Sequence, residues 1–161
     1  MEHAKKLRLG WFSFTCCEDS SIVFTELLNE YYFEWKKVID FAYIRMLKSK
    51  NSLNDLDVAF VEGAISSEGQ KHELQEIRKN SKKLIAVGAC AVTGKPSGAR
   101  NDFPKEVVEK YKDIFDRFEY SDKVMRLDEV VKVDDKIPGC PMKGEEFVIK
   151  LNALLKEFGV D

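Results

Sequence analysis

The sequence has no long apolar run, which is the pattern that a membrane-spanning helix requires. None of its segments approaches the roughly 18 consecutive apolar residues that mark such a helix. Residues 1–7 (MEHAKKL) also lack the apolar stretch and the small-residue cleavage site of a secretory signal. We therefore expect no direct membrane insertion and a cytoplasmic location, which is compatible with attachment to a membrane complex through partners.

A surplus of positive charge is missing as well. The chain carries 26 Lys and Arg against 28 Asp and Glu, for a net charge of −2. Nucleic-acid-binding domains usually concentrate Lys and Arg on one face, so this balance indicates no nucleic-acid partner. Repeats, low-complexity tracts and Gly/Ser-rich linkers are absent too. Because 44% of the 161 residues are hydrophobic, residues 1–161 are predicted to form one domain with its own core.

Cysteine is scarce, and the four cysteines include no CxxC pair. A chain of this length does not need disulfide bonds to fold. The neighbouring Cys16 and Cys17 are also poorly placed to bond to each other. The missing CxxC weakens both a structural zinc site and a thiol–disulfide enzyme. Buried structural thiols, a redox pair and metal ligation remain as explanations.

Apolar runs and helical periodicity alternate along the chain. Residues 57–63 and 83–90 are nearly unbroken apolar runs, as in strands that are covered on both faces. The whole pattern predicts strands at 7–14, 40–44, 57–63, 83–90 and 123–132, and helices at 22–37, 66–80, 105–118 and 144–158. This alternation indicates an α/β domain with a mainly parallel sheet.

Every cysteine falls in a turn or at the end of a predicted strand. Cys16 and Cys17 follow the first strand, Cys90 ends the strand at 83–90, and Cys140 stands in a Pro-Gly-Cys-Pro turn. Parallel sheets bind ligands at the carboxyl ends of their strands, and soft thiolates select iron–sulfur clusters or zinc. Four thiols supply what a cubane cluster takes, although Cys90 by itself fits core packing equally well.

Four short segments, taken together and in order, carry a family resemblance. They are residues 15–18 (TCCE), 61–65 (VEGAI), 86–94 (AVGACAVTG) and 137–141 (IPGCP). With these segments the chain resembles the small, electron-transferring subunit of [NiFe] hydrogenases. It is also similar to the homologous 20 kDa cluster subunit of respiratory complex I. The likeness covers about residues 7 to 158.

The resemblance implies a flavodoxin-like three-layer domain that holds one [4Fe–4S] cluster. The cluster ligands would be Cys16, Cys17, Cys90 and Cys140, and no cysteine follows Cys140 for a further cluster. The resemblance makes the chain an oxidoreductase subunit without a catalytic residue of its own, because the nickel–iron site is expected in a large-subunit partner. Electrons would then pass to further electron-transfer subunits.

Details near the cysteines separate the two branches of this family. Hydrogenase small subunits typically open with a CxxC pair, whereas complex I subunits use tandem cysteines. Phe14 stands where the earlier cysteine would be, so Cys16 and Cys17 are more like complex I. Glu62-Gly63 and residues 98–101 (GARN) are more like short, soluble hydrogenase small subunits of archaeal type. We favour the hydrogenase branch; complex I and a cluster-free scaffold subunit remain as alternatives.

Glu18 directly follows the tandem cysteines, at the predicted start of the first helix. A carboxylate there could relay protons or face the metal site of the partner. Carboxylates before a helix more often cap its free N–H groups and interact with its positive end. We favour this capping role for Glu18.

Overall fold

The computed structural model describes residues 5–160, so residues 1–4 and 161 of the predicted domain lie outside the description. At its centre is a five-stranded sheet in which every neighbouring pair of strands is parallel. The strands stand in the order β2-β1-β3-β5-β7, with the bounds β1 Leu7–Ser13, β2 Ile39–Ile44, β3 Leu56–Glu62, β5 Ser81–Val87 and β7 Asp135–Ile137. This is the strand order of flavodoxin-like folds, and it confirms the predicted α/β class.

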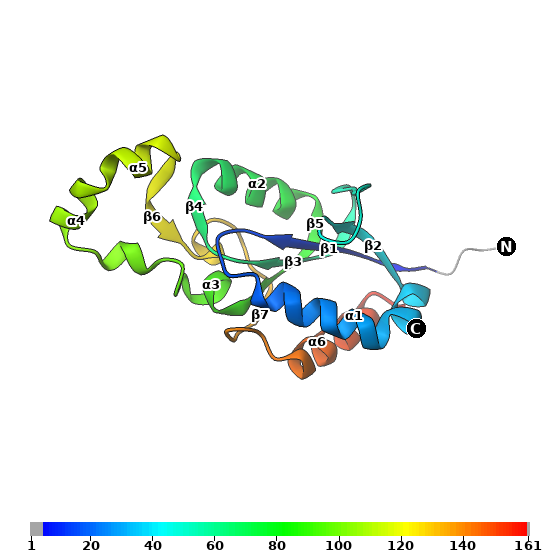
Figure 1. Ribbon diagram of the computed structural model, residues 1–161. Helices are drawn as coiled ribbons and strands as arrows, with labels where there is room; N and C mark the ends of the chain where they lie inside the picture. The colour runs from blue at the N-terminus through cyan, green and yellow to red at the C-terminus, as the bar shows by residue number, and fades with distance from the viewer. Residues whose placement is uncertain (1–4, 161) are drawn as a thin grey trace.

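Helices cover both faces of the sheet and complete three layers (Figure 1). On one face lie α1 (Asp19–Val38) and α6 (Gly144–Glu157), and on the other lies α2 (Glu68–Lys79). An antiparallel pair, β4 (Ile65–Ser67) and β6 (Tyr120–Met125), forms a second small sheet. The remaining short helices are α3 Gly88–Thr93, η1 Ala99–Asp102, α4 Lys105–Lys110, α5 Lys112–Arg117 and η2 Leu127–Glu129.

Aromatic rings form much of the core between the sheet, α1 and α6. Trp11 of β1 stacks on Phe24 of α1 with ring centroids 4.4 Å apart, and Phe147 of α6 meets Phe24 edge-on at 5.4 Å. Such ring pairs add a geometric preference to the burial of their surface. The start of α1 is thereby held against β1, and the loop between them carries two cysteines.

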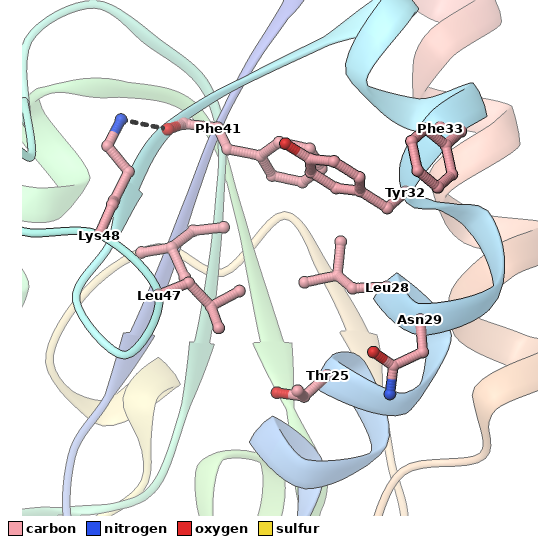
Figure 2. Close-up of a pocket in the computed structure, with 9 residues that line it drawn as sticks. Thr25, Leu28, Asn29, Tyr32, Phe33, Phe41, Leu47 and Lys48 are labelled. Atoms are coloured by element: carbon pink, nitrogen blue, oxygen red, sulfur yellow. Dashed lines mark hydrogen bonds between the residues drawn. The ribbon is translucent and has the colours of Figure 1, made fainter.

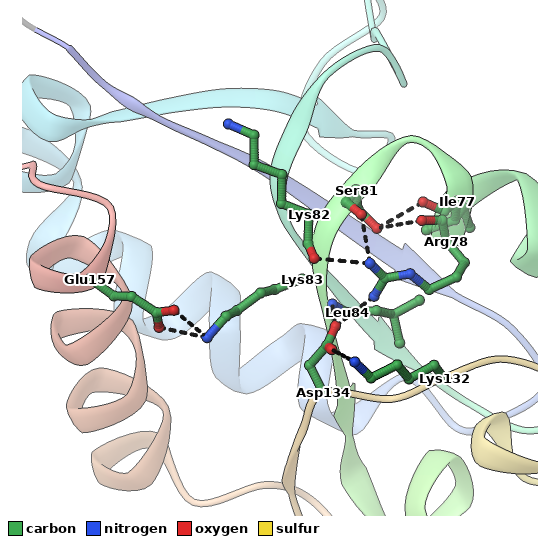
Figure 3. Close-up of polar contacts among 9 residues, drawn as sticks. All are labelled: Ile77, Arg78, Ser81, Lys82, Lys83, Leu84, Lys132, Asp134 and Glu157. Atoms are coloured by element: carbon green, nitrogen blue, oxygen red, sulfur yellow. Dashed lines mark hydrogen bonds and ion pairs between the residues drawn. The ribbon is translucent and has the colours of Figure 1, made fainter.

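Ion pairs and hydrogen bonds connect β5 to the segment before β7 and to α6 at the amino end of the sheet (Figure 3). Arg78 Nη1 lies 2.6 Å from Asp134 Oδ2, and the same carboxylate accepts a hydrogen bond from Leu84 N at 2.9 Å. Lys83 pairs with Glu157 of α6 at 2.6 Å. Because Asp134 immediately precedes β7, these contacts fix where β7 begins beside β5.

Three elements differ from their predictions. The helix predicted at 105–118 is divided into α4 and α5 at Tyr111, and neither half has a buried residue. The strand predicted at 123–132 is replaced by β6 and η2. The fifth strand of the sheet, β7, has no counterpart among the predicted strands. Two of its three residues, Asp135 and Lys136, are charged, so it contains no apolar run.

Candidate functional site

The four cysteines meet at the carboxyl ends of the parallel strands. Cys16 and Cys17 lie between β1 and α1, Cys90 lies in α3 after β5, and Cys140 follows β7. All four line one cavity as free thiols. Cys90 is buried, Cys16 is half-buried, and Cys17 and Cys140 are exposed. The predicted strand ending in Cys90 stops earlier, at Val87, so this thiol is held by a short helix instead.

Hydrogen bonds connect the loops that carry these thiols. Ala89 N donates to Gly139 O at 2.6 Å, which joins α3 to the loop after β7. Met142 N donates to the buried Ser20 Oγ at 3.2 Å, which joins that loop to the start of α1. The cysteine-bearing loops therefore form one connected rim around the cavity.

Two glycines let the backbone pass close to this rim. Gly63 has a φ of +89°, and a Cβ there would lie 2.7 Å from the carbonyl carbon of Phe14. Gly139 has a φ of +127°, and a Cβ there would lie 2.5 Å from Pro141 O. Side chains are excluded at both positions by the left-handed backbone and by the lack of space. The loops after β1, β3 and β7 depend on them for their shape.

Glu62 is a buried carboxylic acid at the end of β3 that also lines the cavity. Its Oε1 accepts hydrogen bonds from Ser13 Oγ, at 2.7 Å, and from Ser21 Oγ. Trp11 Nε1 in turn donates to Ser21 Oγ at 2.8 Å. Burial raises the pKa of Glu62, and the two hydroxyl donors oppose part of that rise. In the sequence, Glu62 stands out only as part of the motif at residues 61–65, and its burial and hydrogen-bonding network could not be predicted.

Cys16 shares its surroundings with Glu62. Burial, followed by the nearby charge of Glu62, raises the pKa of Cys16 to about 12. The thiol is therefore protonated near neutral pH when no cation is present. A bound metal removes that proton, because its positive charge stabilises the thiolate. A thiol that is protonated near neutral pH is a poor free nucleophile, because the thiolate is the reactive form.

Glu18 does not act as predicted. It is the N-cap residue of α1, with a left-handed φ of 62°, but its side chain makes no capping hydrogen bond. Its backbone N–H instead points to the sulfur of Cys16, with an N···S distance of 3.4 Å. The predicted position of Glu18 at the helix start is confirmed, but its carboxylate does not make the predicted capping hydrogen bond. The proton-relay role stays a prediction.

A second polar group reaches a thiol from a loop that the sequence does not mark. Ser97 Oγ lies 3.1 Å from Cys90 Sγ. Ser97 stands between a proline and a glycine in the segment after α3, which reads as an ordinary turn. The contact arises from how this turn closes on α3, so sequence patterns carry no signal for it.

The donor set at this site is four thiols, the number that a cubane cluster takes. Within residues 5–160, no three His, Cys, Asp or Glu side chains converge on a point that could hold one metal ion. Structural zinc needs such convergence, with sulfur about 2.3 Å from the ion. In a cubane cluster each thiolate binds a different iron, so the sulfurs surround the cluster. Only about 20 Å³ is open among the thiols, and the exposed Cys17 and Cys140 can change rotamer to make room.

A larger cavity, of about 550 Å³, lies between α1 and β2 (Figure 2). Its wall is mostly apolar, and Lys48 Nζ donates to Phe41 O at 2.7 Å. No carboxylate, thiol or imidazole is among its lining residues. Tyr32 and Lys48 are its titratable lining side chains, and no hydrogen bond joins them. The size of this cavity alone does not make it the functional site.

The fold and the thiols together define a flavodoxin-like domain with a four-cysteine site at the carboxyl edge of its sheet. A match over residues 16–154 to the family described as "NADH ubiquinone oxidoreductase, 20 Kd subunit" shows that the chain belongs to this family. The family resemblance read from the four sequence motifs is confirmed.

Hydrogenase subunits are among the relatives of this chain. It is 30% identical over 149 residues to sulfhydrogenase 2 subunit delta of Pyrococcus furiosus, which covers 87% of this chain and 58% of the relative. It is 36% identical over 117 residues to NAD-reducing hydrogenase HoxS subunit delta of Cupriavidus necator. This alignment covers 61% of this chain and 54% of the relative. The chain spans about half the length of the curated relatives it matches.

Solved hydrogenases share the three-layer fold. A chain of an NAD⁺-reducing [NiFe]-hydrogenase in the H₂-reduced state matches with a TM-score of 0.82 at 22% identity, over 98% of this chain and 94% of that one. A chain of the [NiFeSe] hydrogenase of Desulfovibrio vulgaris Hildenborough matches with a TM-score of 0.66 at 16% identity. The match covers 95% of this chain and 62% of that one. Identities this low establish the fold alone. Separately, no helix within residues 5–160 has the length and apolar character to cross a bilayer.

Proposed function

We propose that this chain is the electron-transfer small subunit of a [NiFe] hydrogenase-type complex and that it holds one [4Fe–4S] cluster. Cys16, Cys17, Cys90 and Cys140 are its ligands. The observation that carries the proposal is that these four free thiols, from three separate loops, line one cavity at the carboxyl edge of the sheet. The family match and the hydrogenase relatives support it.

When bound, the cluster would take up and release single electrons. The residues of this chain hold it and set its surroundings. Glu18 N and the Ser97 hydroxyl lie within reach of two ligating sulfurs, at 3.4 and 3.1 Å. Burial and such hydrogen bonds are the means by which a protein adjusts a cluster potential. The exposure of Cys17 and Cys140 leaves one side of the site open to a partner.

The partners follow from this role. Hydrogen would be split or formed at a nickel–iron site in a large subunit, so this chain is an oxidoreductase subunit in which no residue is assigned a catalytic role. All four cysteines are used by one cluster. We expect electrons to continue to further electron-transfer subunits, and we place this complex in the cytoplasm.

The second candidate is the cluster-bearing 20 kDa subunit of a complex I-like quinone oxidoreductase. The tandem Cys16 and Cys17 favour it, and so does the description of the matched family. The two candidates differ in the large subunit. Nickel in the large subunit that copurifies with the chain supports the hydrogenase role, and a nickel-free partner that reduces quinone supports the alternative.

Iron binding tests the assignment of the ligands. We expect about four iron atoms per chain after anaerobic reconstitution, as a [4Fe–4S] cluster requires, and a large loss of iron in Cys140→Ala. Met46→Ser is the matched control, because Met46 is an exposed sulfur-containing side chain near the same edge of the sheet. Unchanged iron in Cys140→Ala would remove this ligand. A wild-type chain that binds no iron would favour the cluster-free scaffold.

A further inference from the structure

We propose that Ser97 raises the redox potential of the bound cluster by donating a hydrogen bond to the Cys90 thiolate. The inference rests on the proposed function, because it requires that Cys90 ligates iron. It assigns a role to a residue outside the four family motifs, in the turn that follows α3.

Metal ligation by Cys90 would fix the direction of this hydrogen bond. Ser97 Oγ and Cys90 Sγ are 3.1 Å apart, and either atom could donate while the thiol keeps its proton. A ligating sulfur has no proton, so the hydroxyl must be the donor once a metal is bound. Within residues 5–160, Ser97 Oγ has no other hydrogen-bonding partner.

The turn that carries Ser97 is held against α3 by its own backbone. Gly94 N donates to Cys90 O at 2.9 Å, and Gly98 N donates to Gly94 O at 2.7 Å. A Cβ at Gly98 would lie only 2.4 Å from Gly94 O, so the turn can close this tightly only with glycine there. The hydroxyl of Ser97 is thus presented to the sulfur by a defined loop.

Cys90 is the ligand for which a donor from the protein matters most. Its residue is only 6% exposed, whereas Cys17 and Cys140 are open to water. Water can donate hydrogen bonds to the exposed sulfurs but has little access to Cys90. Reduction adds a negative charge that spreads onto the sulfurs, and a donor stabilises this state more than the oxidised one. The Ser97 hydroxyl therefore favours reduction.

The potential of the reconstituted chain tests this inference directly. Ser97→Ala is expected to lower the equilibrium constant for one-electron reduction about fivefold, in line with the loss of one hydrogen bond. At 59 mV per tenfold change, this is a shift of about 40 mV to lower potential. Ser97→Thr keeps a hydroxyl and should stay near the wild type. The measurement is a redox titration followed by the electron paramagnetic resonance signal of the reduced cluster.

Thr93→Val is the matched control. Its hydroxyl belongs to the same segment and bonds to Ala89 O at 2.8 Å and to the backbone of Lys95, but to no thiol. Its loss removes backbone contacts of the turn without removing a donor to sulfur, so the potential should stay unchanged. Equal potentials in wild type and Ser97→Ala, or an equal shift in Thr93→Val, would overturn the role of Ser97. Either result would leave the cluster assignment intact, which instead fails if the wild type binds no iron.

Cluster loss in a variant is also decisive. If Ser97→Ala and Ser97→Gly fail to retain iron while Ser97→Thr retains it, the hydroxyl acts on the cluster, as inferred. If all three variants lose iron, Ser97 only shapes the turn, and the inference is wrong.

Discussion

Glu62, at the end of β3, and Cys16, in the loop after β1, border the same cavity, and the charge of the carboxylate contributes to the raised pKa of the thiol. Burial is the larger cause of the raised pKa of Cys16, and the charge of Glu62 is the next. A buried acid beside a thiol disfavours the thiolate as long as no cation is bound. This coupling between Glu62 and Cys16 can be tested in the metal-free chain.

Glu62→Gln should make Cys16 more reactive in the metal-free chain. The substitution removes a negative charge but leaves the burial of the thiol, so the pKa of Cys16 falls only part of the way to its usual value. We expect alkylation of Cys16 by iodoacetamide at pH 8 to accelerate roughly threefold to tenfold, where tenfold corresponds to one pKa unit. Peptide mass spectrometry measures the rate. Glu26→Gln, an exposed site on α1, is the control, and equal rates in all three proteins would contradict the coupling.

Glu62 should also give the stability of the metal-free chain a distinctive pH dependence. Its folded pKa is raised by burial, so between the unfolded and folded pKa values the folded state binds a proton that the unfolded state does not. The contribution of Glu62 to stability is therefore present below the unfolded pKa and is lost as pH rises through the folded pKa. Glu62→Gln has no such proton. Its free energy of unfolding in urea should rise relative to wild type across this window, and a constant difference would contradict the raised pKa.

Gly63→Ala should destabilise the loops around the site. Its φ of +89° and the 2.7 Å approach to Phe14 leave no place for a Cβ. We expect a loss of about 2–4 kcal/mol in the free energy of unfolding. Gly69→Ala in α2 is the matched control, because its nearest neighbour would be 3.9 Å away. Alanine there should stabilise the chain by about 0.5–1 kcal/mol. Similar effects at the two glycines would contradict this explanation.

Phe24→Ala should be among the most costly core substitutions. The ring is fully buried and stacked on Trp11 at 4.4 Å, so its removal leaves a cavity under the site. A loss of about 3–5 kcal/mol is expected. Phe33 lies on the same helix but is 70% exposed, and Phe33→Ala should change stability by about 0.5 kcal/mol or less. Chemical denaturation of both variants measures the contrast, which would be absent if Phe24 were not a core residue.

The central strands and long helices could be predicted because their own residues carry the pattern. All seven residues of β3 are buried and five of them are apolar, so the strand reads as a nearly unbroken apolar run. In contrast, β7 is a short strand that is fixed by Asp134, whose carboxylate bonds to Arg78 and Leu84 from other elements. A strand that is fixed by contacts with other elements leaves no pattern in its own residues from which it could be predicted.

The same distinction holds for the site. The cysteines could be placed at one edge because parallel topology brings strand ends together. The hydrogen-bond donors to the cysteine sulfurs could not be predicted from the sequence. Ser97 reaches Cys90 only because a turn closes on α3, and Glu18 donates through its backbone N–H. The burial of Glu62 likewise depends on Ser13 and Ser21, which come from two other segments. The ligand roles themselves and the cytoplasmic location stay predictions.

Native mass spectrometry of the anaerobically purified chain tests the central claim most directly. The mass of one intact [4Fe–4S] cluster should be added to that of the polypeptide, and Cys90→Ala should lose most of this adduct. A polypeptide that carries a single zinc ion, or no inorganic adduct under conditions that preserve clusters in a known ferredoxin, would contradict the account.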